Sequence, residues 1–137
     1  VLYADGEATG AEITVTMRKA DGGGYCVMGS KGLGSDINLA WPTAQIAVMG
    51  AAGAVGFIYR KELMAADAKG LDTVALAKSF EREYEDHMLN PYHAAERGLI
   101  DAVILPSETR GQISRNLRLL KHKNVTRPAR KHGNMPL

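Results

Sequence analysis

The sequence has few cysteines, few aromatic residues and no long apolar run, and these shortages exclude several classes of protein. Cys26 is the single cysteine, so no disulfide can form within the chain, and we expect a reducing compartment such as the cytoplasm. No run approaches the roughly 18 apolar residues of a membrane-spanning helix. The net charge of +2 is too small to indicate a nucleic-acid-binding protein. We therefore expect neither a membrane nor a nucleic acid as a partner.

The start of the chain also lacks familiar features. Position 1 is not Met, and no basic stretch followed by an apolar one indicates a secretory signal. Val1 opens directly into an apolar stretch, so we expect the chain to be a piece of a longer protein. Its 137 residues, 45% of them hydrophobic and 23% charged, suit one globular domain.

Short apolar runs alternate with helical patterns along the chain and predict an α/β fold. Residues 13–17, 37–41, 45–49 and 101–105 have the composition of strands. Apolar periodicity and capping residues predict helices at about 25–29, 50–64, 73–88 and 92–97, and a last helix after Ser107. Asp72, Asn90 and Ser107 are the expected N-caps, and Pro91 follows Asn90 at the first helical position. No internal repeat is visible.

A run of three glycines, Gly22, Gly23 and Gly24, links the first predicted strand to the first predicted helix. The first N–H groups of a helix have no partner within it, so they can bind an anion or an oxyanion that forms during a reaction. Glycine lets a ligand approach the backbone because it has no Cβ. Glycine triplets also occur in ordinary tight turns, so a purely structural turn is the alternative.

Longer segments resemble a known family, the carboxyltransferase β subunits of biotin-dependent acetyl- and propionyl-CoA carboxylases of the actinobacterial type. The resemblance covers nearly the whole chain. Its end matches the natural end of the family subunit, and its start falls inside the C-terminal domain. The matching segments are residues 23–33, 36–60, 84–86, 90–98, 100–104, 109–111 and 131–137.

The resemblance implies a fold and a domain. Family members are similar to crotonase, with ββα turns wound into a superhelix, so the chain is expected to be a partial crotonase-like α/β structure with C-terminal helices. Residues 1–137 would be the C-terminal part of the C-terminal domain, on the biotin side of the active site. The N-terminal domain, which holds the acyl-CoA, would be absent from the chain.

The resemblance also implies a reaction. Carbon dioxide moves from N1 of carboxybiotin to the α-carbon of acetyl-CoA, propionyl-CoA or a longer acyl-CoA, which gives products of the malonyl- or methylmalonyl-CoA type. Biotin is carried on a carrier protein, and ATP is used only at a separate biotin carboxylase subunit. The implied partners are the biotin carboxylase and biotin carboxyl carrier subunits, the acyl-CoA substrate, and further copies of the subunit in a hexamer.

Site residues carry over by position. The backbone N–H groups of Gly23 and Gly24 would stabilise the ureido oxygen of biotin, with Gly22 beside them in the cofactor site. Tyr25 and Cys26 would line the acyl pocket. Two positions depart from the family, since Asp21 stands where a tyrosine is usual and Gly24 stands where an alanine is usual. A carboxylate at Asp21 would oppose catalysis if it pointed into the site and would be harmless if it were exposed.

Other residues have plainer interpretations. Trp41 is expected in the core, near the biotin site, and the glycine-containing stretch at residues 5–12 is expected to weaken a helix that the family has there. The basic stretch from Lys121 to Lys131 is expected to be solvated or to pack on a neighbouring subunit, with binding of an acidic partner or a phosphate as the alternative. His87, His93, His122 and His132 show no spacing that indicates a metal site.

Two alternative functions stay open. One is a biotin-dependent acyl-CoA decarboxylase subunit, which runs related chemistry in the reverse direction. The similarity of residues 25–31 to the actinobacterial carboxylases argues against it. A catalytically inactive assembly or scaffold piece would keep the subunit contacts and lose the reaction. Because the acyl-CoA half of the site would be absent, we expect that the chain by itself carboxylates no acyl-CoA.

Overall fold

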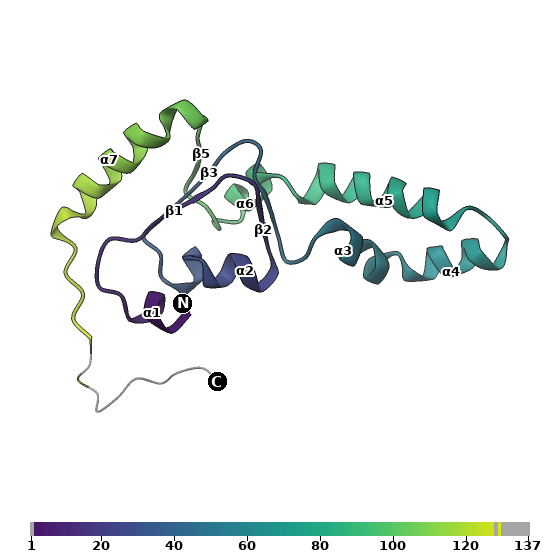
Figure 1. Cartoon of the computed structure of the whole chain (residues 1–137), viewed down its shortest axis with the longest axis horizontal. Coiled ribbons are helices and arrows are strands. Elements are labelled where there is room, and N and C mark those ends of the chain that lie inside the picture. The colour runs from purple at the N-terminus through teal and green to yellow at the C-terminus, as the bar shows by residue number, and fades with distance from the viewer. Residues whose placement is uncertain (1, 128, 130–137) are drawn as a thin grey trace.

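Two successive β-β-α turns form the body of the molecule in the computed structural model, which describes residues 2–127 and residue 129 (Figure 1). The first turn consists of β1 (Ile13–Thr16), β2 (Lys19–Asp21) and α2 (Gly22–Val27). The second repeats the order with β3 (Ile37–Ala40), β4 (Gln45–Ala47) and α3 (Ala51–Ile58). The structure therefore contains a repeat that the sequence does not display.

The two turns stack strand on strand, and every pair is parallel. Ile13 lies opposite Ile37 in the β1–β3 pair, and Lys19 lies opposite Gln45 in the β2–β4 pair. β5 (Ala102–Val103) joins the other edge of β3, so one sheet has the order β1-β3-β5 and the other contains β2 and β4. The strand expected at 101–105 is thus much shorter than predicted.

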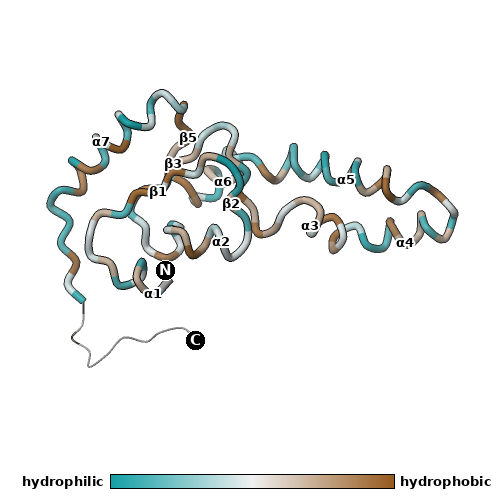
Figure 2. The backbone as a smooth tube through the Cα atoms, in the orientation of Figure 1, coloured by the Kyte–Doolittle hydropathy of each residue, from teal (hydrophilic) through white to brown (hydrophobic). Residues whose placement is uncertain are grey.

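The core lies where the strands meet α6 (Pro91–Glu96). Parallel sheets are covered on both faces, so their residues are apolar with little alternation. β3 is covered in this way, because Asn38, Leu39 and Ala40 are all buried, although Asn38 is polar. Figure 2 shows the apolar colouring along β1 and β3. The core cluster comprises Ala40, Ala44, Ile46, Ala94 and Ile100, with Ala20, Tyr25, Ala95 and Val103 packed against it.

A helical arm extends from the body and consists of α3, α4 (Arg60–Ala68) and α5 (Thr73–Met88) (Figure 1). The single helix predicted at 50–64 was wrong, because the chain bends at Tyr59, whose φ of −99° and ψ of 21° are not helical. The bend allows both α3 and α4 to pack on α5, and the Tyr59 ring stacks on Phe80 with 4.2 Å between ring centroids. Several large apolar side chains of the arm stay exposed, namely Phe57, Ile58, Met64, Leu71 and Val74.

Two predicted helix caps are confirmed. A carboxylate oxygen of Asp72 accepts hydrogen bonds from the Val74 and Ala75 amides, both at 3.0 Å. The Asn90 side chain accepts one from the His93 amide at 2.9 Å, with Pro91 at the first position of α6. These side chains satisfy amides that have no partner inside the helix.

The predicted cap of the last helix was wrong. Ser107 lies inside a 3₁₀ turn, Pro106–Glu108, and α7 (Thr109–Leu119) begins after it. The Glu108 carboxylate reaches back to accept a hydrogen bond from the Leu105 amide at 2.8 Å. The carboxylate, not the serine hydroxyl, therefore fixes the entry to α7.

The segment after α7 returns to the start of the chain. α1 (Leu2–Glu7) does form, despite Gly6. The Lys123 ammonium lies 2.8 Å from the Asp36 carboxylate, which also accepts a hydrogen bond from the Glu12 amide at 2.8 Å. Burial alone would raise the pKa of Asp36, but these hydrogen bonds and the charge of Lys123 hold it below its usual range.

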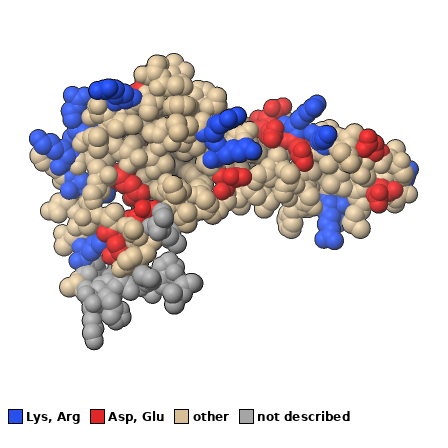
Figure 3. All heavy atoms as spheres, in the orientation of Figure 1, with Lys and Arg blue, Asp and Glu red and all other residues tan. Residues whose placement is uncertain are grey.

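The surface over α7 carries a gathering of Lys and Arg side chains (Figure 3). Part of the basic stretch predicted from Lys121 to Lys131 packs on the chain's own start, since Arg127 donates to the Ala8 carbonyl at 3.2 Å. Residues 128 and 130–137, including His132 and the family match at 131–137, lie outside the described residues. Within the described part, no helix is long and apolar enough to cross a membrane.

Candidate functional site

The glycine run forms the first turn of α2, three residues earlier than the helix start predicted at about Tyr25. Gly22 has a φ of 58°, which turns the chain from β2 into the helix, and Gly29 with a φ of 77° follows its end. A Cβ on Gly22 would lie 3.3 Å from the Val48 carbonyl oxygen. Position 22 therefore requires glycine both for its backbone angle and for its close neighbour.

Gly23 and Gly24 differ from Gly22. Both are exposed, and a Cβ on either would meet nothing within 4 Å. The chain itself therefore gives no steric reason for glycine at these two positions, and the space in front of them is open. A ligand that approaches the backbone closely would supply the reason.

The first turn of α2 presents backbone donors. The early N–H groups of a helix have no partner within it, and the N-cap residue Asp21 makes no side-chain cap bond to them. The helix has six residues, so its dipole is small and the amides themselves are what it offers to an anion.

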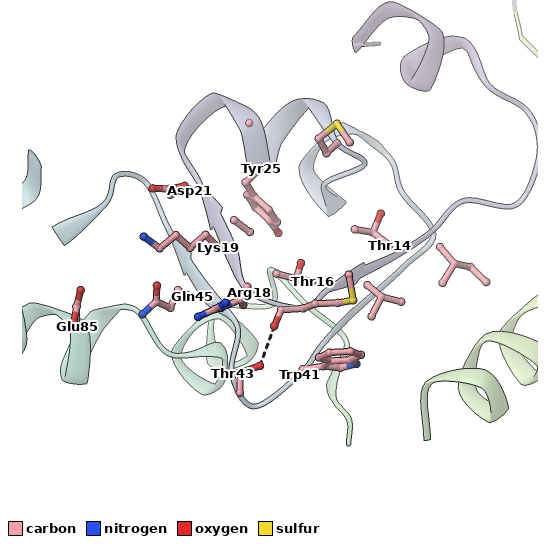
Figure 4. A pocket seen from close by; sticks show the side chains of 16 residues that line it. Thr14, Thr16, Arg18, Lys19, Asp21, Tyr25, Trp41, Thr43, Gln45 and Glu85 are labelled. Atoms are coloured by element: carbon pink, nitrogen blue, oxygen red, sulfur yellow. Dashed lines mark hydrogen bonds between the residues drawn. The ribbon is translucent and has the colours of Figure 1, made fainter. Parts of the chain in front are cut away.

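A wide hollow of about 1450 Å³ opens beside this turn (Figure 4). Gly24 and Tyr25 lie on its wall, with β1 and β2 running along it and Trp41, Thr43 and Gln45 contributing from the second turn. Its charged side chains are Arg18, Lys19, Asp21 and Glu85. The hollow combines apolar side chains with two cations and two carboxylates, so it is a surface suited to a polar ligand.

The structure places the predicted site residues unequally. Gly24 and Tyr25 border the hollow, whereas Gly22, Gly23 and Cys26 are not part of its wall, and Cys26 is exposed. Arg18 and Lys19 were missed in the sequence, although their position at the end of the first strand, just before the glycine run, was the available signal.

Tyr25 has a second attachment besides the hollow. Its hydroxyl donates a hydrogen bond to the Leu99 carbonyl at 3.2 Å, and its ring packs against the core cluster. Burial raises the pKa of Tyr25 above its ordinary value, and the nearby Cys26 adds to the rise. The hydroxyl is therefore protonated at neutral pH and can serve as a donor.

Asp21 does not aim at the helix amides. Its carboxylate lies against Gly50, with Oδ2 3.1 Å from the position that a Cβ on Gly50 would occupy. The same side chain borders a second, small cavity of about 40 Å³ together with Lys19, Gln45 and Glu85. Figure 4 shows Asp21 and Lys19 on the side of the hollow that faces Glu85, away from Trp41. The Asp21 carboxylate is thus directed toward Gly50 and not toward the α2 amides, although Asp21 also borders the hollow.

Trp41 is half-buried, not fully buried as a core residue would be. Its indole N–H donates to the Thr109 hydroxyl at 2.9 Å, which ties the wall of the hollow to the start of α7. The Thr43 hydroxyl donates to the Met17 carbonyl at 2.9 Å and holds the two turns together at the same edge. These contacts give the wall a fixed shape.

Histidines make no cluster with carboxylates or Cys26 in the described part of the chain, where no group of three or more metal-ligating side chains occurs. His93 Nδ1 lies 3.4 Å from the Glu96 carboxylate, one helical turn away on α6. That pairing is a local helix contact.

Comparisons with known proteins are consistent over the whole chain. Residues 1–135 match the family model described as the carboxyl transferase domain. The chain is 62% identical over all 137 residues to the biotin-dependent acetyl-/propionyl-coenzyme A carboxylase beta5 subunit of Mycobacterium tuberculosis. It is 50% identical to the methylmalonyl-CoA decarboxylase subunit alpha of Propionigenium modestum. It spans about a quarter of the length of these relatives.

A solved structure has the same fold. The crystal structure of transcarboxylase 12S, a hexamer with methylmalonyl-coenzyme A and methylmalonic acid bound, matches 99% of this chain with a TM-score of 0.87 and 48% identity. The chain covers 25% of that protein. This likeness confirms the expected α/β, crotonase-like fold.

Proposed function

Because the chain belongs to the carboxyl transferase domain family, we propose that the protein containing it moves a carboxyl group from carboxybiotin to the α-carbon of an acyl-CoA. The single observation that carries this proposal is the open first turn of α2 beside the hollow. The Cβ positions of Gly23 and Gly24 are open, and Gly24 lies on the wall of the hollow.

The residues present fit a ureido ring. Biotin, when bound, supplies the carboxyl group, and negative charge develops on its ureido oxygen as carbon dioxide leaves. Backbone N–H groups at Gly23 and Gly24 would stabilise that charge, with Gly22 shaping the turn that presents them. Removing one such donor typically lowers kcat on the order of a hundredfold to a thousandfold.

The acyl-CoA is held, on this proposal, mainly by the three quarters of the relatives' length that the chain does not span. The 137 residues would be the biotin-side wall, from the C-terminal part of a C-terminal domain. Tyr25 would border the acyl end of the hollow, and Cys26 would reach it only in the complete protein. Catalysis would come from bringing the two ligands together in a fixed geometry.

The proposed partners follow from the reaction. Carboxybiotin would arrive on a biotin carboxyl carrier chain from a biotin carboxylase subunit, which alone would use ATP, and the cytoplasm would be the compartment. Self-association into a hexamer is proposed because the transcarboxylase neighbour assembles in that way. The exposed apolar side chains of the arm offer a surface for such a contact.

The test uses the full-length protein that contains this chain, with a carboxylated carrier and propionyl-CoA. Gly23→Val would place a bulky side chain in the open space at the Gly23 Cβ position, in the first turn of α2. We expect the transfer rate to fall at least a hundredfold and saturable biotin binding to be lost. Gly111→Val is the matched control, because Gly111 is an exposed glycine in the first turn of α7, away from the arm, with nothing within 4 Å of its Cβ position.

Three outcomes would contradict the proposal. Transfer by Gly23→Val at the unmodified rate would move the biotin site elsewhere. Biotin binding with no transfer to any acyl-CoA would favour the inactive scaffold. Net decarboxylation of methylmalonyl-CoA without the forward reaction would favour the decarboxylase. This alternative is considered because the relative from Propionigenium modestum is a methylmalonyl-CoA decarboxylase subunit.

A further inference from the structure

The helix that begins with the glycine run has little to hold it in place by itself. It has six residues, three of them glycine, and none of its residues is buried. Glycine is about 1 kcal/mol less favourable than alanine in a helix, and helices this short are not stable alone. The orientation of α2 must therefore be imposed by contacts from other parts of the chain.

Two side chains make such contacts, and both reach the same short segment, Leu99–Asp101. The Tyr25 hydroxyl donates to the Leu99 carbonyl at 3.2 Å across 74 positions of sequence. The Lys31 ammonium, just beyond α2, pairs with the Asp101 carboxylate across 70 positions. The segment therefore holds α2 at the helix itself and again just past its end.

The segment is itself well fixed. Ile100 between the two anchor points is 3% exposed and belongs to the core cluster. The Asp101 carboxylate accepts a hydrogen bond from the backbone N–H of Asn38 at 2.8 Å. The backbone N–H of Asp101 donates to the backbone carbonyl of Asn38, also at 2.8 Å. Since Asn38 lies in β3, the anchor connects α2 to the central strand of the three-stranded sheet.

The Lys31–Asp101 pair is partly exposed, so its contribution to stability is small. Its geometric role does not depend on that contribution. A pair whose carboxylate is held by a strand amide can fix where the neighbouring segment lies, even where it adds little to the free energy of folding.

We propose that Tyr25, Lys31 and Asp101 are positioning residues that set the orientation of α2 and, through it, of the Gly23 and Gly24 amides. The inference rests on the proposed function, because it assigns these residues to the same site. None of the three needs to touch the reacting atoms. Each acts through the helix.

The experiment uses the full-length protein with Tyr25→Phe, Lys31→Met, Asp101→Asn and the Lys31→Met/Asp101→Asn double variant. Tyr25→Phe keeps the ring in the core and removes only the hydroxyl. We expect kcat to fall roughly tenfold to a hundredfold, the range that follows from displacing a catalytic group by up to about 1 Å. The KM for the acyl-CoA should stay within about twofold, since a purely positioning effect leaves ground-state binding intact. The double variant should be no worse than either single one.

Matched controls are Tyr59→Phe and Asp67→Asn on the arm, which make the same chemical changes away from α2 and should leave kcat unchanged. A second measurement, backbone amide hydrogen exchange, reports on the helix without any reaction. Exchange within α2 should accelerate in Tyr25→Phe and Asp101→Asn relative to the controls, while exchange within α5 stays the same.

The two readouts separate the possible failures. Unchanged exchange in α2 together with unchanged kcat would overturn the positioning role. Faster exchange in α2 in a protein that carries out no carboxyl transfer would support the anchor and refute the proposed function. A fall in kcat accompanied by a lower free energy of unfolding and by faster exchange in α5 as well as α2 would mean that the three residues only stabilise the whole fold. That outcome would overturn the proposal.

Discussion

Gly22, Gly23 and Gly24 are neighbours in the chain but have different structural roles. Gly22 is in the left-handed region and lies close to a carbonyl oxygen, whereas the Cβ positions of the other two point into open space. The glycine at position 22 serves the fold, and those at 23 and 24 are proposed to let a ligand approach the backbone. A sequence cannot separate these roles, because all three residues read the same.

Alanine substitution at these positions should separate the two roles. Gly22→Ala should destabilise the protein by about 1–2 kcal/mol, because a side chain is strained at positive φ. Gly23→Ala should change stability in the other direction by roughly 0.5–1 kcal/mol, since it limits the unfolded chain and favours the helix. Urea unfolding of the two variants measures the difference. Equal effects at both positions would contradict the different roles inferred for the two glycines.

At the scale of single elements, the start of a helix is fixed by a side chain that accepts a hydrogen bond from a backbone amide two or three residues away. Asp72 caps α5 and Asn90 caps α6, and both act locally. The Ser107 hydroxyl is a suitable capping group, but Ser107 does not stand at the N-cap position. Pro106 starts a 3₁₀ turn, so the helix begins two residues after Ser107. The long helix predicted through Tyr59 failed for a non-local reason, since its two halves both pack on α5.

Two alanine substitutions test this difference between caps. Asp72→Ala removes an acceptor that serves two amides and should cost about 1 kcal/mol of stability. Ser107→Ala removes a hydroxyl that caps no helix and should fall within about 0.5 kcal/mol of the unmodified protein. Thermal or urea unfolding distinguishes them. A larger loss at Ser107 than at Asp72 would mean that the hydroxyl, not Glu108, fixes the entry to α7.

At the scale of the whole molecule, two stacked β-β-α turns carry a helical arm on one side and α7 on the other (Figure 1). The strands β1 and β2 both lie at open edges of their sheets, and the hollow runs along them. One wall of a site is thus displayed to its surroundings. The opposite wall is proposed to belong to the rest of the longer protein.

The isolated chain should therefore fail as a catalyst. We expect no carboxylation of acetyl-CoA or propionyl-CoA by the purified 137 residues with a carboxylated carrier present. Without the second wall the two ligands meet only by diffusion, and the advantage of fixed geometry, which reaches about 7–11 kcal/mol, is lost. Transfer of a labelled carboxyl group from the carrier to the acyl-CoA is the measurement, with the full-length protein as the positive control. Turnover by the chain alone would show that the acyl-CoA site lies within it.

Local chemistry made part of the fold and site predictable. The strands at 13–17 and 37–41 followed from β-branched and apolar residues, the caps at Asp72 and Asn90 from their side chains, and the glycine run from its composition. The repeat of β-β-α turns could not be read in this way. Parallel strands pair through backbone groups, so Ile13 and Ile37 can occupy matching places in two turns that otherwise share little sequence.

The sequence by itself determined the family, the strand-forming segments and the local caps, because each depends on residues close together in the chain or on their order. Only the tertiary structure decided where the Asp21 carboxylate points, which residue accepts the hydrogen bond from the Tyr25 hydroxyl, and where the helix predicted at residues 50–64 bends. Each of these depends on a partner far away in sequence, namely Gly50, Leu99 and α5. Composition and spacing carry no information about a contact until the chain has folded to make it.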